Sequence, residues 1–151
     1  FLLEGVDLAF AADAVQIYGG ASGLPTIENS TLYRKSVQRL LKEVRPKRLY
    51  LGHPFRGSTG DMQSAQIEGE QVAAVLQASL DRDTQLSDVM RRHLTNGLPA
   101  EQHELYGPFG RVAAEIGYTG DPRNLPCAFF VTMHAYKEEL IGTENNERRK
   151  F

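Results

Sequence analysis

Two residues whose side chains suit metal binding or proton transfer each follow a short apolar run. Asp13 comes directly after DLAFAA at 7–12, and His53 comes directly after RLYLG at 48–52. Loops beyond strand ends are where open α/β sheets place their sites, because the strands hold the loops in position and leave the side chains accessible. Each residue also has an ordinary explanation, since Asp often forms turns and a lone His often makes a hydrogen bond in a loop.

The segment between these residues predicts the elements that position them. Residues 7–12 predict a buried strand, and 18–31 (YGGASGLPTIENST) predict a loop rich in Gly, Pro, Ser and Asn. Ser30 or Thr31 can cap a following helix that runs to Arg45, because Pro46 stops it. The apolar stripe of this helix consists of Tyr33, Val37, Leu40, Leu41 and Val44. With a second strand at 48–52, the order strand–loop–helix–strand predicts a crossover unit and a layered α/β fold.

Past Gly60 the pattern predicts a cluster of short helices. Apolar spacing predicts helices over 63–80, 85–94, 109–116 and 128–141. Thr84 is the predicted cap of the second of these, and Gly117 the predicted end of the third. The last eight residues, ENNERRKF at 144–151, read as a polar, frayed tail.

The first sixty residues resemble the second half of a metallo-β-lactamase-fold hydrolase. The order of features that carries the resemblance spans 7–57: Asp13 in AADAVQ, a Gly-rich loop with Leu24-Pro25, a helix with YRKS at 33–36, and LGHPF at 51–55. In that family one strand ends in a Gly-Asp pair whose Asp bridges two metal ions. After a helix, another strand ends in Gly-His, whose His binds one metal. Asp13 matches the bridging Asp of the family, and Gly52-His53 matches its Gly-His pair. Ala12 differs, because the family usually has Gly at this position.

The resemblance implies the C-terminal half of an αββα sandwich that binds one or two zinc ions. Asp13 and His53 would be metal ligands. Asp13 would also orient a metal-activated hydroxide that attacks a small ester, thioester or lactone, and Arg56 would contact an anionic substrate group. The family's upstream His-x-His-x-Asp-His run is missing, because no His precedes Asp13 among the four at 53, 93, 103 and 134. Zinc needs about three protein ligands.

We therefore expect a fragment that is inactive without an N-terminal half, as its start at Phe1 without a Met also indicates. Residues 1–60 would be the metallo-β-lactamase-like part, 61–143 a helical region similar to a small winged-helix module, and 144–151 the tail. Thr132-Met133-His134 with Leu140 and Gly142 carries the winged-helix resemblance. The alternative is that Phe129, Met133, Tyr136 and Leu140 only complete the core.

A second reading of the whole chain is a non-catalytic metallo-β-lactamase-like module that binds a partner or nucleic acid. The net charge is −2, yet residues 31–60 hold eight basic groups against Glu43 alone. The simpler explanation is that Arg34, Lys35, Arg39 and Lys42 form the solvated face of one helix. Because no aromatic residues alternate with these charges, we do not expect nucleic-acid binding.

Composition indicates where the protein works. No apolar run approaches the ~20 residues of a membrane span, so we expect no membrane association. The single cysteine, Cys127, excludes an internal disulfide framework and predicts a buried, inert thiol in a cytoplasmic protein. A small-molecule substrate is the expected ligand, and the oligomeric state is left open.

Overall fold

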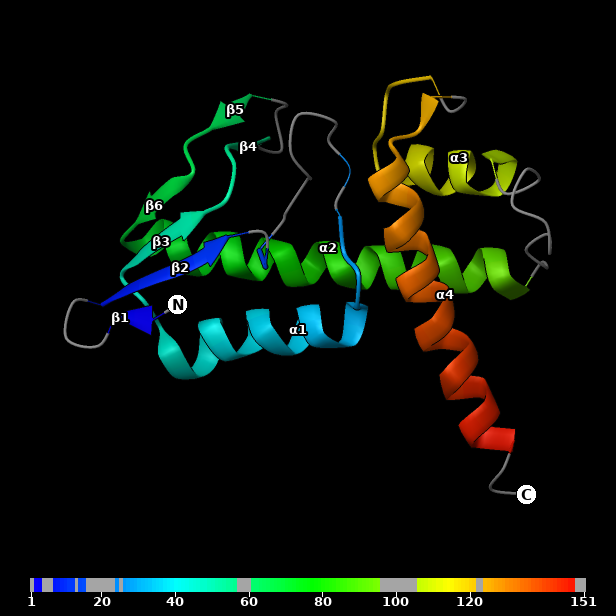
Figure 1. The fold of residues 1–151 in the computed structure, drawn as a ribbon, viewed down its shortest axis with the longest axis horizontal. Helices are drawn as coiled ribbons and strands as arrows, with labels where there is room; N and C mark the ends of the chain where they lie inside the picture. The colour runs from blue at the N-terminus through cyan, green and yellow to red at the C-terminus, as the bar shows by residue number, and fades with distance from the viewer. Residues whose placement is uncertain are drawn as a thin grey trace.

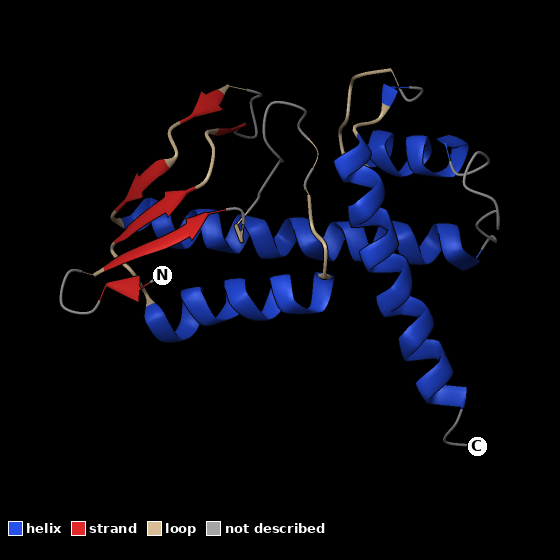
Figure 2. Ribbon diagram, in the orientation of Figure 1, coloured by secondary structure: helices blue, strands red, loops and turns tan. Residues whose placement is uncertain are grey.

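The computed structural model describes residues 2–3, 7–12, 14–15, 24, 26–56, 61–95, 106–121 and 124–148. Within them the protein is mixed α/β, with a small sheet at one end and four α-helices (Figures 1 and 2). Among these residues, no helix has the length and apolar character needed to cross a membrane.

The main sheet has four strands in the order β1-β2-β3-β6. Its strands are β1 (Leu2–Leu3), β2 (Leu8–Ala12), β3 (Arg48–Leu51) and β6 (Gln66–Glu68). β2 and β3 are parallel, as the crossover prediction requires, and the outer strands are antiparallel to them. β4 (Phe55–Arg56) and β5 (Met62–Gln63) form a separate antiparallel pair. The two predicted strands are thus confirmed, but Gln63 and residues 66–68 belong to strands, not to the predicted helix.

The sheet buries one face against helices. Ala9, Leu49 and Ile67 are buried on that face and share a core cluster with side chains of α1 and α2. The opposite face is partly open to solvent, since Phe10 is 44% exposed and stacks at 5.3 Å against the ring of Tyr50. This alternation along β2 and β3 is the period-two pattern of a sheet with one buried face.

The cap of the crossover helix lies one residue before Ser30, the first of its two predicted caps. α1 spans Ser30–Arg39, and the side chain of Asn29 accepts the hydrogen bond from the Leu32 N–H at 2.8 Å. Asn29 is therefore the cap, and Ser30 turns inward to bond Glu139 instead. The helix continues as a π-helical turn, η1 (Leu40–Val44), which ends at Arg45 in the left-handed conformation with φ +48°.

The two short helices predicted over 63–80 and 85–94 are one helix. α2 runs without a break over Glu70–Thr95, 26 residues. The Thr84 hydroxyl does not cap a helix; it donates to the Leu80 carbonyl at 3.0 Å, one turn back within α2. The polar stretch at 81–85 suggested a break, but Asp83 is buried and held by partners from other helices.

Two further helices complete the fold. α3 (Tyr106–Glu115) ends before Gly117, whose φ of +90° fits the predicted end. α4 (Cys127–Arg148) has 22 residues and continues through most of the predicted tail, because no proline interrupts it. With α2 at 26 residues, the C-terminal region is thus not a cluster of short helices. Cys127 is exposed, contrary to the buried thiol predicted, since it is the first residue of α4.

Candidate functional site

The carboxyl ends of β2 and β3 lie next to each other. Ala12 pairs with Leu51 in the parallel ladder, and the Gly52 N–H donates to the Ala12 carbonyl at 3.0 Å. The ends of β2 and β3, which precede Asp13 and His53 in the sequence, therefore lie side by side at one edge of the sheet. Asp13 itself lies outside the described residues, so its side chain is not placed.

Ala12 has the backbone conformation that usually selects glycine. Its φ is +46°, in the left-handed region, where a side chain costs roughly 1 kcal/mol. The ladder also shifts register between Phe10 and Ala12. Irregularities of this kind bend a strand end and redirect the side chains that follow it. The sequence departs from the family's Gly-Asp pair at Ala12, but the backbone there keeps the geometry that a glycine would favour.

His53 lies in the bend after β3 and is exposed to solvent. Arg56 belongs to β4, where its backbone pairs with Met62; its side chain is outside what the structure describes. The Gly57–Gly60 loop, which follows it, is also outside the described residues. The structure thus brings position 53 to the same edge as the end of β2, and it leaves the contribution of Arg56 to experiment.

The remaining histidines have other roles. His93 on α2 bonds Glu115 through Nε2 at 2.9 Å, and His134 on α4 faces the ring of Phe109 edge-on at 6.1 Å. His103 lies outside the described residues. No group of three or more His, Cys, Asp or Glu side chains suited to a metal occurs within the described part of the chain. A carboxylate and an imidazole are ligands that zinc accepts, so Asp13 and His53 fit part of a zinc site, and about one more protein ligand is needed.

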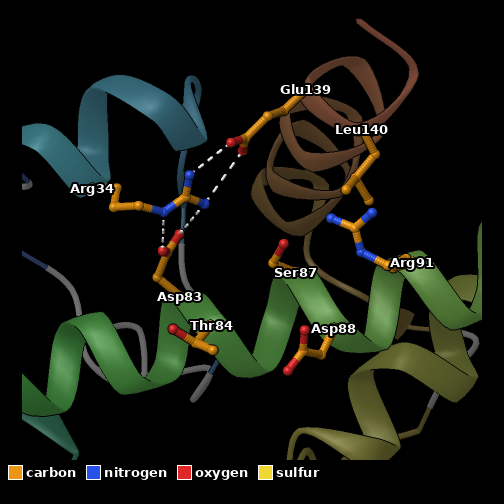
Figure 3. Close-up of a pocket in the computed structure, with 8 residues that line it drawn as sticks. All are labelled: Arg34, Asp83, Thr84, Ser87, Asp88, Arg91, Glu139 and Leu140. Atoms are coloured by element: carbon orange, nitrogen blue, oxygen red, sulfur yellow. Dashed lines mark hydrogen bonds and ion pairs between the residues drawn. The ribbon is translucent and has the colours of Figure 1, made fainter. Parts of the chain in front are cut away.

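A second polar cluster, which we did not predict from the sequence, joins three helices. Arg34 of α1 donates from Nε to Asp83 of α2 at 2.6 Å and from Nη1 to Glu139 of α4 at 2.6 Å (Figure 3). The Tyr136 hydroxyl donates to Asp83 at 2.6 Å, and the Ser30 hydroxyl donates to Glu139. We call these five residues the Arg34 clasp. The prediction that Arg34 belongs to the solvated face of its helix is wrong.

The clasp keeps its charges because each group supports its neighbour. Hydrogen bonds to Glu139 and Asp83 raise the pKa of Arg34. Burial acts to raise the pKa of Glu139, but the hydrogen bonds from Arg34 and Ser30 outweigh it and lower that pKa overall. Burial and the charge of Asp83 raise the pKa of Tyr136, which stays a neutral donor. The charged side chains of the clasp are thus paired with one another. The clasp therefore acts as a structural link between helices.

A signal for the clasp existed in the sequence. The buried stripe of α2 runs through Val72, Leu76, Ser79, Leu86 and Met90. Asp83 falls on this stripe, four residues after Ser79 and three before Leu86. A carboxylate at a buried helix position needs a cation or several donors.

No family model, curated protein or solved structure matches this chain.

Proposed function

We propose that this chain is the C-terminal portion of a zinc-dependent hydrolase with a metallo-β-lactamase fold, acting on a small ester, thioester or lactone. The observation that carries the proposal is the backbone hydrogen bond from Gly52 to Ala12, at the carboxyl end of the parallel β2–β3 pair. This bond joins the ends of two neighbouring strands. The proposed metal ligands follow these strands in the sequence, Asp13 after β2 and His53 after β3. This is the edge where α/β sheets place their ligands.

Two further features support the proposal. First, the left-handed backbone at Ala12 suits the position that the family gives to glycine. Second, the face of the sheet that carries Phe10 and Tyr50 is partly exposed, although it presents two aromatic rings. In a sandwich of two sheets, such a face packs against the second sheet, about 10 Å away.

In this proposal the chain supplies ligands and orientation. His53 would bind the metal through one ring nitrogen, and the carboxylate of Asp13 would bind it from the neighbouring strand end. Bound zinc supplies Lewis acidity and a lowered pKa for a water ligand. Arg56, two residues after the His53-Pro54 bend, would hold an anionic part of the substrate. The ligands still needed would come from the sequence before Phe1.

The test is zinc binding by the chain extended with the coding sequence that precedes Phe1. Purified protein should contain about one or two equivalents of zinc by elemental analysis. Asp13→Ala and His53→Ala should each lower that content, whereas His134→Ala, an exposed histidine on α4, should leave it unchanged. Equal zinc content in all three variants would exclude the proposed ligands.

Hydrolysis is measured on the same proteins with a thioester, a lactone and a p-nitrophenyl ester. The extended chain should hydrolyse at least one of them, and the 151-residue chain alone should hydrolyse none. Zinc bound without hydrolysis of any of these substrates would exclude the proposed substrate class and favour the non-catalytic module.

A further inference from the structure

An apolar pocket lies at the opposite end of β3 from His53. It has a volume of about 410 Å³ and lies between η1, the Arg45–Lys47 connection and the start of α2. Figure 1 shows the end of η1 and the first turns of α2 side by side, next to the turn into β3. This volume is in the ~300–1,000 Å³ range of small-molecule sites. Its apolar lining comes from Leu40, Leu41, Pro46, Val72, Ala73 and Leu76.

The backbone around this pocket is unusual on the η1 side. The Arg45 N–H bonds the Leu40 carbonyl, five residues back, which closes a π-helical turn wider than an α-helical one. Arg45 then adopts φ +48°, a conformation that costs a non-glycine residue about 1 kcal/mol or more. Single π-helical turns and strained residues of this kind are frequent at ligand-binding sites. Here Leu40, Leu41 and Arg45 of this segment all line the pocket.

Two cations border the pocket on the same side. Arg45 is exposed, and its side chain donates from Nε to the Lys42 carbonyl at 2.8 Å, which anchors the guanidinium. Lys47 pairs with Asp7 at 2.8 Å, with both side chains mostly exposed. An exposed pair of this kind is weak and can be shared with another anion. The one acid in the lining, Glu70, belongs to the first turn of α2, across from η1.

We propose that this pocket binds a monomeric alkyl carboxylate. The alkyl chain would lie against Leu40, Val72 and Leu76, and the carboxylate would meet the guanidinium of Arg45, with Lys47 beside it. A planar guanidinium recognises a carboxylate through two parallel N–H bonds. The site is at the opposite end of the sheet from the proposed zinc ligands. This proposal therefore does not depend on the proposed hydrolase activity.

The experiment is a titration of the 151-residue chain with decanoate below its micelle concentration, followed by amide chemical shifts. The expected result is saturable one-to-one binding, with the largest shifts at Leu40–Lys47 and Gly69–Leu76. Decyltrimethylammonium has the same chain and the opposite charge, and it should bind more weakly by up to about fivefold, the largest factor that one exposed ion pair supplies.

Two variants test the two halves of the site. Ala73→Phe fills the pocket from an exposed position on α2 and should abolish binding. Its matched control, Ala74→Phe, adds the same ring at a neighbouring exposed position that does not line the pocket, and should bind normally. Arg45→Gly relieves the left-handed strain, so the protein stays folded, and should weaken decanoate binding about fivefold. Arg39 is an exposed cation that does not line the pocket, so Arg39→Gln should leave decanoate binding unchanged.

Shifts spread over the whole surface, equal affinity for the two detergents, or unchanged binding in Ala73→Phe would each overturn the proposal. Normal affinity in Arg45→Gly would remove the assignment of the carboxylate to Arg45.

Discussion

Arg34 illustrates how much one side chain can connect. Its side chain is only 29% exposed, and its guanidinium is shared between Asp83, whose side chain is 2% exposed, and Glu139. Removing one partner of a buried ion pair costs more than the pair contributes, because the remaining charge stays desolvated. The loss at this position falls mainly on Asp83, which would keep the Tyr136 hydroxyl as its described donor.

We therefore expect Arg34→Met to lower the free energy of unfolding by about 3 kcal/mol, measured by urea denaturation at neutral pH. Methionine keeps the unbranched apolar part of the arginine side chain and lacks the guanidinium, so the change reports mainly the loss of the charge and its hydrogen bonds. Arg39→Met is the matched control on the same helix. Arg39 pairs with Glu43 at 3.5 Å and both side chains are more than 70% exposed, so this change should cost less than about 1 kcal/mol. Equal losses in the two variants would show that the clasp contributes nothing specific.

At the scale of elements, the clasp connects α1, α2 and α4, and its stability should depend on pH. The pKa of Glu139 lies below its ordinary value of 4.5, so the folded protein binds a proton there less readily than the unfolded chain. The contribution of Glu139 is therefore complete above about pH 4.5 and is lost as the pH falls through its lowered value. We expect the urea midpoint to fall as the pH is lowered below 4.5, and to fall less steeply in Glu139→Gln. The same slope in both proteins would assign the acid sensitivity to other carboxylates.

The two central strands, β2 and β3, and most helices could be predicted because their patterns are local. The apolar run before Asp13, the run before His53 and the spacing of Tyr33 and Val37 each lie within one element. The edge of the sheet where β2 and β3 both end could also be predicted. Two buried strands that pair in parallel end at the same edge. The order of strands and helix along the chain was therefore enough to predict a candidate site at this edge. The role of Asp13 in that site stays a prediction.

The unbroken α2 and the clasp could not be predicted from local pattern. Thr84 has the side chain of a helix cap, and only its bond to Leu80 shows that it lies mid-helix. Asp83 appeared to be one of several polar residues at a break. Its partners Arg34 and Tyr136 are 49 and 53 residues away in sequence, so a reading of neighbouring residues does not find them.

At the scale of the whole molecule, the core continues across residue 60. Ala9 and Leu49 from β2 and β3 share one cluster with Ile67 of β6 and with Val72 and Leu76 of α2. The antiparallel pairing of β3 with β6 also supplies backbone hydrogen bonds from beyond residue 60. The sheet therefore depends on the first part of the helical region.

A polypeptide of residues 1–60 should for this reason not fold alone. We expect poorly dispersed amide signals and no cooperative thermal transition by circular dichroism. A polypeptide of residues 1–95, which adds β6 and all of α2, should regain part of the native dispersion. The full chain should unfold in one transition by two probes, far-ultraviolet ellipticity and tyrosine fluorescence. Cooperative folding of residues 1–60 would instead establish an independent unit that ends there.

The order of synthesis gives the link between α1 and α4 a further consequence. The bonds from Ile27 to Thr132 and from Arg34 to Glu139 each join residues 105 positions apart. At roughly 5–20 residues per second, a ribosome adds the partner about 5–20 s after the first residue of each pair. Until then Tyr33 and Val37, both buried in the finished protein, lack the α4 members of their core cluster, such as Tyr136. A chain that stops before α4 would keep this apolar surface exposed, and the cell's proteases and chaperones could thereby distinguish it from a finished one.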